Sequence, residues 1–124
     1  IRTLLGRRCR FDKWEPQQFG TRKIMDHKTA YAEHGNAIKR AFTHKAMNRL
    51  IQGSAADMTK KAMKMLYDEG IIPHIQVHDE LDFSIESKEQ IDKIKEIMES
   101  CVELVVPIKV DVDLGPNWGE AKEI

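Results

Sequence analysis

Apolar residues recur through the first part of the chain at the spacing of an α-helix. Ile24, Tyr31 and Ile38 stand one heptad apart and predict a first helix that begins near Ile24. A second helix is predicted from about residue 51 to residue 69, with Gly70 as its C-terminal stop. Its apolar side would consist of Ala55, Met58, Ala62, Met65 and Leu66. Glycine and proline interrupt the stretch before both helices, which predicts an irregular or short-stranded entry.

The later part of the chain alternates apolar and polar residues as β-strands do. Residues 71–77 and 81–85 predict the two strands of a β-hairpin, and residues 108–114 predict a further, half-buried strand. Between them, a capping box at Ser87 and Gln90 predicts the start of a helix. The apolar face of that helix would consist of Ile91, Ile94, Met98, Cys101 and Val105. The expected fold is α+β: a small, mostly antiparallel sheet, made of the hairpin plus the C-terminal strand and backed by helices.

Charge is divided unequally along a chain whose formal net charge is zero. Residues 1–66 hold 15 Lys and Arg against 5 Asp and Glu, and residues 67–124 hold 5 against 15. A basic half is typical of proteins with a polyanion partner, although two solvated faces that attract each other would give the same numbers. No membrane span or secretion signal is visible. Cys9 and Cys101 lack metal-ligand spacing and are expected to be free thiols in a reducing cytoplasm.

Three polar residues, His78, Asp79 and Glu80, stand between the two predicted hairpin strands. A tight turn between paired strands projects carboxylates from a rigid support, which suits the binding of a divalent cation. Mg²⁺ often takes one or two carboxylates together with phosphates and waters, so Asp79 would need a second carboxylate or a phosphorylated substrate beside it. Two simpler interpretations remain open, namely polar turn residues and a buried, hydrogen-bonded His78. A His–Asp hydrolase is disfavoured because no nucleophile elbow accompanies the pair.

Four blocks of the sequence resemble, in order, segments of the family A (DNA polymerase I-like) DNA polymerases. Residues 3–8 (TLLGRR) resemble the segment that leaves the fingers, and residues 48–57 (NRLIQGSAAD) resemble a helix upstream of motif C. Residues 75–81 (IQVHDEL) resemble motif C itself. Residues 106–112 (VPIKVDV) and 115–118 (GPNW) resemble the last strand and the ending of the family. The chain is therefore similar to the C-terminal part of such a polymerase over nearly its whole length.

The resemblance implies a palm-like fold, with residues 1–23 as a fingers-exit segment and residues 24–124 as the palm segment that carries motif C. It implies a DNA-directed DNA polymerase, in which a primer 3′-hydroxyl attacks the α-phosphate of a deoxynucleoside triphosphate and pyrophosphate leaves. Two Mg²⁺ ions would serve this reaction in DNA replication or repair. The implied partners are a DNA primer–template, deoxynucleoside triphosphates and the N-terminal remainder of the polymerase, in cis or as a separate chain. No membrane partner is expected, and the setting would be the cytoplasm of a bacterial or phage-infected cell.

The resemblance also assigns roles to residues of the predicted hairpin. Asp79 would be one of two aspartates that ligate the catalytic Mg²⁺, and Glu80 would be an accessory catalytic carboxylate. His78 would lie near the primer terminus and contact DNA. The second metal-binding aspartate of the family, in motif A, has no counterpart in these residues. The chain by itself is therefore not expected to polymerise DNA.

Asn48 and Gln52 match residues that reach the minor-groove side of the primer–template. Their spacing places both amides on one helical face, provided that the helix continues through Leu50. Amide donors can test the shape of a base pair there, because every base pair offers minor-groove acceptors at similar positions. The alternative is that Asn48 caps the second helix and Gln52 is a surface residue.

Basic residues near Asn48 are expected to contact DNA phosphates without reading sequence. These residues are Lys39, Arg40, His44, Lys45 and Arg49. His44 stands where the family commonly has arginine, which weakens the expectation of a duplex contact there. Leu50 stands where proline is common, as in a few viral members, so a phage-like relative is expected. The stretch from Phe11 to Ala30 is longer than in typical bacterial members and has no assigned function.

Two other classes of function compete with the polymerase interpretation. A non-catalytic DNA-binding or scaffold module that retains the palm shape would show the same sequence blocks. A metal-dependent nuclease would use similar carboxylates and would degrade DNA without added nucleotides. The role of Asp79 in primer extension separates these classes.

Overall fold

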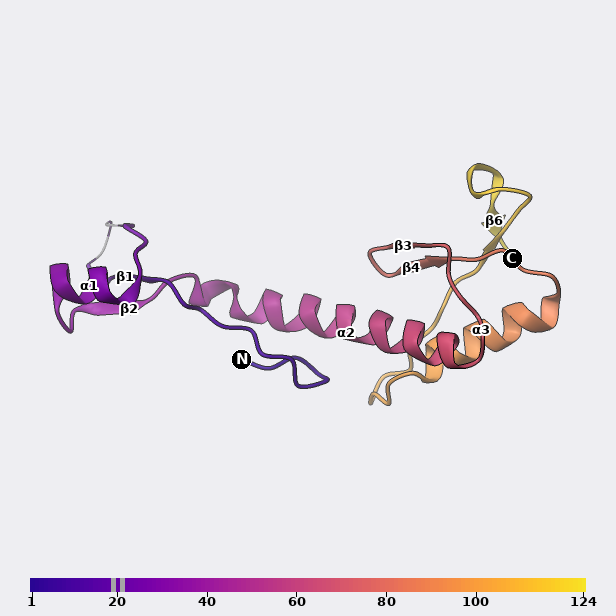
Figure 1. Ribbon diagram of the computed structural model, residues 1–124, viewed down its shortest axis with the longest axis horizontal. Coiled ribbons are helices and arrows are strands. Elements are labelled where there is room, and N and C mark those ends of the chain that lie inside the picture. Colours follow the sequence, from indigo (N-terminus) through magenta and orange to yellow (C-terminus); the bar gives the residue numbers. More distant parts are fainter. Residues whose placement is uncertain (19, 21) are drawn as a thin grey trace. The chain divides into compact units, whose positions relative to one another are not determined.

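The computed structural model describes residues 1–18, 20 and 22–124. The elements, in chain order, are β1 (Trp14–Pro16), α1 (His27–His34), β2 (Ile38–Arg40), the 3₁₀ turn η1 (Thr43–Lys45), α2 (Ala46–Asp68), β3 (Ile75–Val77), β4 (Glu80–Asp82), α3 (Lys88–Ser100), β5 (Asp113–Leu114), the 3₁₀ turn η2 (Trp118–Glu120) and β6 (Lys122–Glu123), as drawn in Figure 1. The strands of the described residues form three antiparallel pairs, β1–β2, β3–β4 and β5–β6. The α+β class is confirmed, with the hairpin and the C-terminal strands in separate two-stranded sheets.

The chain divides into two compact units, residues 1–57 and residues 58–124, and each is described by itself. Helix α2 begins in the first unit and ends in the second. None of the helices in the described part of the chain combines the length and the apolar character that a membrane crossing requires.

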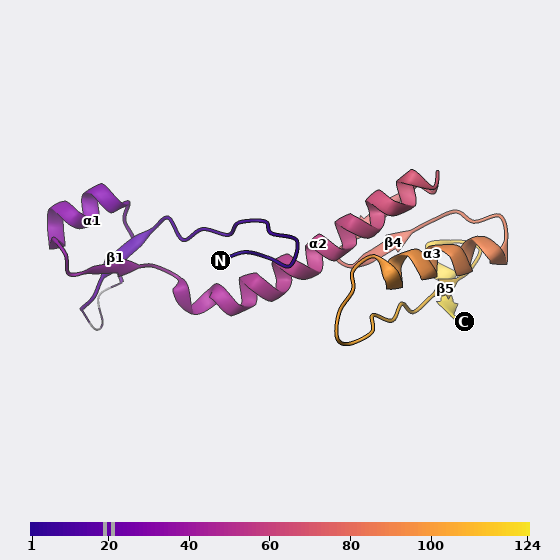
Figure 2. The same ribbon diagram turned by 90° about the horizontal axis from the view of Figure 1, so that it is seen from below.

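In the first unit, α1 packs against the β1–β2 pair, as Figure 2 shows. Strand pairing sets Trp14 opposite Arg40. Met25, Ala30 and Ile38 form a small buried cluster, and Trp14 packs against it. Helix α1 begins after Asp26, whose side chain accepts a hydrogen bond from the Thr29 backbone N–H at 3.0 Å and so caps the helix. Residues 1–18 thus contain one short strand in an otherwise irregular entry, as the glycine and proline pattern predicted.

The expected long first helix is wrong, because α1 ends at His34. Gly35 follows with a positive φ of 56°, a conformation that glycine adopts without strain and that ends a helix. Ile38, expected on the helical stripe, lies instead in β2 and contributes to the core. Tyr31 is exposed, so the heptad spacing of these residues does not correspond to one buried helical face.

The N-terminal segment of the first unit binds along one face of α2. The Leu4 backbone N–H donates to Ser54 Oγ at 3.0 Å. The Arg7 side chain donates from Nε to Asp57 Oδ1 at 2.8 Å and from Nη2 to the Gly53 carbonyl at 2.9 Å. These bonds fix the segment to the helix by polar contacts more than by apolar packing.

Gly53 lies inside α2, near the point where the sequence predicted the helix to start. Glycine in a helix interior costs roughly 1 kcal/mol relative to alanine, so a tertiary reason is expected. A Cβ atom at this position would lie 2.8 Å from Thr3 Cγ2, which is too close. Gly53 therefore allows the N-terminal segment to approach the helix backbone.

In the second unit, the last turns of α2 pack against α3. Leu66, Ile71 and Ile94 form one buried cluster, and Ala62, Cys101 and Val102 form another. Gly70 has a φ of 75° after the end of α2, and this confirms it as the helix stop. Of the predicted apolar side of α2, Ala55 lies on the exposed surface.

Helix α3 starts as the capping box predicted. Ser87 Oγ accepts from the Gln90 backbone N–H at 3.4 Å, and Gln90 Oε1 accepts from the Glu86 backbone N–H at 3.0 Å. The helix ends at Ser100, so Val105 is fully exposed and does not extend the apolar face. Both cysteines are free; Cys101 is buried, and burial raises the pKa of its thiol.

The C-terminal region is only partly the strand that alternation predicted. Of residues 108–114, Asp113 and Leu114 form β5, which pairs with β6 in the register Asp113↔Glu123 and Leu114↔Lys122. Glu120 completes η2, and Lys122 and Glu123 form β6. A strand pair here requires a tight turn between β5 and η2, which the Gly-Pro-Asn sequence provides.

Candidate active site and nucleic-acid interface

His78 and Asp79 form the two-residue loop of the β3–β4 hairpin. Strand pairing brings Val77 opposite Glu80, so only these two residues remain to turn the chain. His78 has a φ of 53°, and a positive φ at this loop position matches the twist of the paired strands. The Gln76 side chain donates from Nε2 to the His78 carbonyl at 2.6 Å, which braces the loop from the neighbouring strand. The sequence prediction of a hairpin with polar residues at its turn is confirmed.

The two carboxylates of this hairpin differ in their partners. Asp79 is exposed, and its carboxylate has no hydrogen bond or ion pair with any residue that the structure describes. Glu80 Oε1 accepts a hydrogen bond from the Trp118 indole N–H at 3.4 Å. Asp79 is thus available to an external ligand, whereas Glu80 is oriented by a residue far along the chain.

The turn that carries Trp118 is held in shape by its own contacts. Asn117 Nδ2 donates to Glu120 Oε1 at 2.8 Å across η2. A Cβ atom on Gly115 would lie 2.7 Å from the Ala121 Cα, so only glycine allows the chain to fold back this closely. The GPNW block, which the sequence assigned only to the ending, therefore supports the hairpin through Trp118.

Asp82 is a further carboxylate of the hairpin, and the sequence did not single it out. It lies in β4 two residues after Glu80, so the two side chains project from the same face of the strand. Its Oδ2 atom is buried and has no hydrogen-bond partner among the described residues. Strict alternation from Leu81 to Ile85 suggested an ordinary outward-facing polar residue, so the pattern gave no signal of this burial.

The donor set of the hairpin fits a shared magnesium site rather than a complete one. Among the described residues, no group of three or more His, Cys, Asp or Glu side chains is placed to hold a metal ion. Asp79, whose carboxylate has no partner among these residues, offers the hard oxygen ligands that Mg²⁺ prefers, and Glu80 lies beside it. Magnesium in nucleotide-processing sites is commonly held by one or two carboxylates and the substrate phosphates, which is compatible with this set.

The two amides predicted to contact the minor groove lie in the first turns of α2. The helix begins at Ala46, so Asn48 is inside it and is not its N-cap. Asn48 and Gln52 are both exposed, and the helix is continuous between them, so they share a face. The condition on which their common orientation depended is met, and their contact with DNA stays a prediction.

The basic residues of the first unit fall into two groups. His44 and Lys45 are exposed in η1, immediately before α2, and Lys45 Nζ lies 5.4 Å from the centroid of the Phe42 ring. Arg49 already has contacts within the protein: its guanidinium stacks 4.8 Å from the Phe11 ring and donates to the Arg10 carbonyl at 3.4 Å. Arg49 thus helps to hold the entry segment to α2, in addition to any contact with phosphate.

Arg40 and Lys39 of β2 also have internal partners. Arg40 stacks 4.6 Å from the Trp14 ring centroid and donates to the Phe11 carbonyl at 2.6 Å. Lys39 Nζ lies 3.6 Å from Glu15 Oε1. The structure thus groups the predicted DNA-contacting residues of α2, β2 and η1 within the first unit and the hairpin residues 78–80 within the second.

Comparison with known proteins decides the family. The family model described as DNA polymerase family A matches residues 1–120. The chain belongs to DNA polymerase family A. A DNA-directed DNA polymerase of Pseudomonas phage M6 is 39% identical over 121 residues, covering 98% of this chain and 15% of the phage protein. This phage relative agrees with the expectation drawn from Leu50.

Cellular polymerases match the chain as well. DNA polymerase theta of Drosophila melanogaster is 35% identical over 121 residues, covering 85% of this chain and 6% of that protein. DNA polymerase I of Geobacillus stearothermophilus is 46% identical over 87 residues, covering 62% of this chain and 10% of that protein. No solved structure matches the chain. The chain thus spans between about one twentieth and one sixth of the length of these relatives.

Proposed function

We propose that this chain forms the C-terminal palm segment of a DNA-directed DNA polymerase and that Asp79 is one of its metal-binding catalytic carboxylates. One observation carries the proposal: in a family A chain, the Asp79 carboxylate is exposed on a two-residue turn between paired strands and has no partner among the residues that the structure describes. A carboxylate with no internal partner is free to bind a cation, and the strands on either side fix its position.

Each residue of the hairpin has a separate task in this proposal. Asp79 would hold Mg²⁺, which when bound would neutralise charge on the attacking oxygen of the primer and on the leaving oxygen of pyrophosphate. Glu80 adds negative charge next to Asp79 and is kept in place by Trp118. His78, whose backbone the Gln76 side chain fixes, lies near the primer terminus and helps to position it.

The first unit would hold the DNA. Asn48 and Gln52 donate amide hydrogen bonds to minor-groove acceptors, which are present at similar positions in every base pair. His44 and Lys45, exposed at the start of α2, contact backbone phosphates, and Arg49 adds its charge from a fixed position. These contacts bind primer–template of any sequence, as a replicative or repair polymerase requires.

The deciding experiment measures primer extension by the polymerase that contains this chain, either as one polypeptide or together with a second one. Asp79→Asn removes the charge and keeps the size of the side chain. We expect its rate to fall by about 10³-fold or more, since a metal ligand supports several kcal/mol of transition-state stabilisation. Asp92→Asn is the matched control, because Asp92 is an exposed aspartate on α3, away from the hairpin turn.

Binding of primer–template by Asp79→Asn should stay close to that of the unmodified polymerase. Equal extension by Asp79→Asn and Asp92→Asn, with DNA binding intact, would remove the catalytic role and favour a non-catalytic DNA-binding module. Degradation of DNA without added nucleotides, abolished by Asp79→Asn, would instead identify a nuclease.

A further inference from the structure

The segment from Phe11 to Phe42 forms a small structure of its own within the first unit. It contains β1, α1 and β2, with the cluster of Met25, Ala30 and Ile38 as its core. Phe42 ends the segment with a left-handed φ of 63° and leads directly into η1 and α2. The longer stretch that had no assigned function is therefore built onto the start of the proposed DNA-binding helix.

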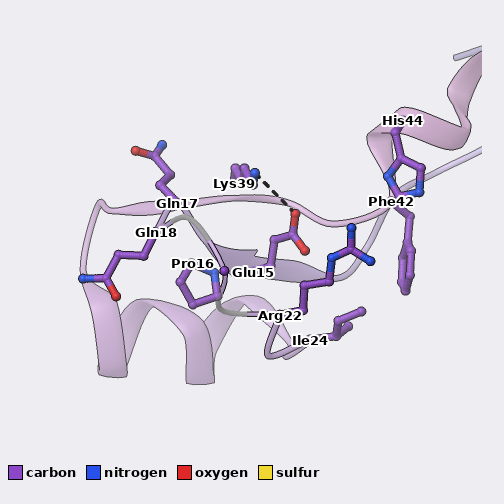
Figure 3. A pocket seen from close by; sticks show the side chains of 10 residues that line it. Glu15, Pro16, Gln17, Gln18, Arg22, Ile24, Lys39, Phe42 and His44 are labelled. Carbon is purple, nitrogen blue, oxygen red and sulfur yellow. Dashed lines mark ion pairs between the residues drawn. The ribbon is translucent and has the colours of Figure 1, made fainter.

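An open pocket of about 580 Å³ lies on this segment, and Figure 3 shows its lining. Three of its side chains are basic: Arg22, Lys39 and His44. Arg22 and His44 have no ion-pair or hydrogen-bond partner within the described part of the chain, and His44 stands in η1 just before α2. Donors without internal partners are free to bind an external acceptor.

Glu15 is the only carboxylate among the described lining residues, and Lys39 lies beside it. The distance from Lys39 Nζ to Glu15 Oε1 is 3.6 Å, longer than a direct charge-assisted hydrogen bond. With Arg22 included, the lining keeps a positive charge even when His44 is neutral. An anion is therefore the ligand that this pocket favours.

Besides two polar amide side chains, the lining contains apolar and aromatic residues. Phe42 and Ile24 stand near the Arg22 side chain in Figure 3, and Pro16 lies near Glu15. An apolar wall next to cations suits a phosphate that carries a sugar better than a bare, fully hydrated anion. A nucleic-acid backbone supplies both groups at a regular spacing.

We propose that this pocket binds one backbone phosphate of the primer–template, with Arg22 and Lys39 as charge partners, His44 as a hydrogen-bond donor and Phe42 against the sugar. The proposal rests on the proposed function, because it places the strand next to the start of α2, where Asn48 and Gln52 contact the minor groove. The pocket thereby adds one phosphate contact to the contacts that α2 makes with the duplex, and residues 11–42 acquire a role in DNA binding.

The test is the salt dependence of primer–template binding by the polymerase that contains this chain, measured by fluorescence anisotropy. The logarithm of the binding constant falls linearly with the logarithm of the salt concentration, and each lost phosphate contact makes this slope less steep by about 0.9. Arg22→Ala and Lys39→Ala should each lower the slope by up to this amount and weaken binding about 3- to 10-fold near 0.1 M salt. The double variant should lose about one contact in total, since both side chains serve the same phosphate.

Two controls separate a specific pocket from general charge. Lys28→Ala removes one exposed positive charge from α1 of the same segment and should leave the slope unchanged. Arg22→Lys keeps the charge and should keep the slope. Equal losses for Arg22→Ala and Lys28→Ala would overturn the pocket, and so would an unchanged slope for Arg22→Ala with normal thermal unfolding.

Free phosphates give the remaining arm of the test. Deoxynucleoside triphosphate, pyrophosphate and inorganic phosphate at millimolar concentration should not compete with the DNA contact of Arg22. An Arg22→Ala variant that weakens nucleotide binding but not DNA binding would assign the pocket to a nucleotide and refute the proposal. A flat salt response of the unmodified polymerase would instead contradict DNA binding by the whole first unit, which is a failure of the proposed function.

Discussion

Asp57 in the first unit and Asp79 in the second both belong to sequence blocks that resemble family A polymerases, yet their surroundings are opposite. Asp57 is 6% exposed and pairs with the Arg7 guanidinium. The Thr3 side chain and then the Arg7 guanidinium hold the pKa of Asp57 below its ordinary value. Asp79 is exposed and has no hydrogen-bond or ion-pair partner among the described residues.

An aspartate in a sequence block that resembles the family can serve either an internal contact or the binding of a ligand. The surroundings of Asp57 and Asp79 separate these two roles. The charge of Asp57 is used inside the protein, where it fixes the N-terminal segment to α2. The carboxylate of Asp79 has no partner in the described part of the chain, so it remains available for a ligand. Similarity of sequence cannot distinguish the two residues, whereas their partners can.

The largest expected effect in this comparison is a change in the thermal unfolding temperature of the chain. Asp57→Asn removes the ion pair with Arg7 and leaves an amide N–H₂ group where Oδ2 is buried without a hydrogen-bond partner among the described residues. We expect the Tm to fall by about 4 °C or more. Asp79→Asn should shift the Tm by no more than about 1 °C, because an exposed turn accepts asparagine. Equal shifts in the two variants would erase the distinction drawn between the two aspartates.

The second prediction concerns the close contact of Gly53 with Thr3. Gly53→Ala should gain roughly 1 kcal/mol from helix propensity but lose about 1–3 kcal/mol from the crowding of Thr3 Cγ2. We expect net destabilisation of about 1 kcal/mol in urea unfolding. Thr3→Ser removes that methyl group and keeps the hydroxyl, so it is the matched partner variant.

The double variant Thr3→Ser/Gly53→Ala should recover most of the loss, because the added methyl group then occupies the space of the removed one. A double-variant cycle measures this coupling. If the loss of stability in the double variant equals the sum of the losses in the two single variants, the N-terminal segment does not pack on α2 as described.

Local signals in the sequence were sufficient for much of the fold. The capping box at Ser87, the helix stop at Gly70 and the hairpin were predictable, because each depends on neighbouring residues. The first helix was not, since heptad spacing from Ile24 to Ile38 was interrupted by Gly35 and the pairing of β2 with β1 is a long-range contact. Strand β6 was not predictable for a similar reason, because it forms only by pairing with β5, on the other side of the turn that contains η2.

The candidate site was predictable to the same extent. Motif resemblance found residues 78–80 and the Asn48–Gln52 pair, because those positions are marked by residue type and spacing. It did not find the Trp118 contact with Glu80 or the buried Asp82 oxygen, which depend on how distant or alternating residues pack. The pocket of the first unit could not be predicted either, because Arg22, Lys39 and His44 are distant in sequence and line one pocket only in the folded chain.

The third prediction extends the comparison to Glu80, which, unlike Asp79, has a hydrogen-bond partner among the described residues. Trp118→Phe keeps an aromatic ring and removes the indole donor to Glu80. A hydrogen bond of this kind contributes about 0.5–1.5 kcal/mol, and its exposure favours the lower end. In the polymerase that contains this chain, the Mg²⁺ concentration for half-maximal primer extension should rise about two- to threefold.

A variant cycle with Glu80→Ala provides the control. If the indole acts through Glu80, Trp118→Phe should have no further effect once Glu80 is alanine, and melting should show that both variants fold. Independent, multiplied effects would mean that Trp118 contributes to the site without Glu80.

The smallest effect concerns the pH dependence of the contact between Asp57 and Arg7. Because the pKa of Asp57 is lowered in the folded chain, the group stabilises the fold above its unfolded pKa, ordinarily near 3.8. That stabilisation is lost as the pH falls through the lower, folded pKa. Arg7→Ala removes one cause of the shift, so its destabilisation should be complete above about pH 5 and should shrink steadily below pH 4. Urea unfolding of Arg7→Ala and of the unmodified chain between pH 3 and pH 7 measures this difference. A difference that is constant over that range would mean that Arg7 stabilises the N-terminal segment through its bond to the Gly53 carbonyl alone and not through the charge of Asp57.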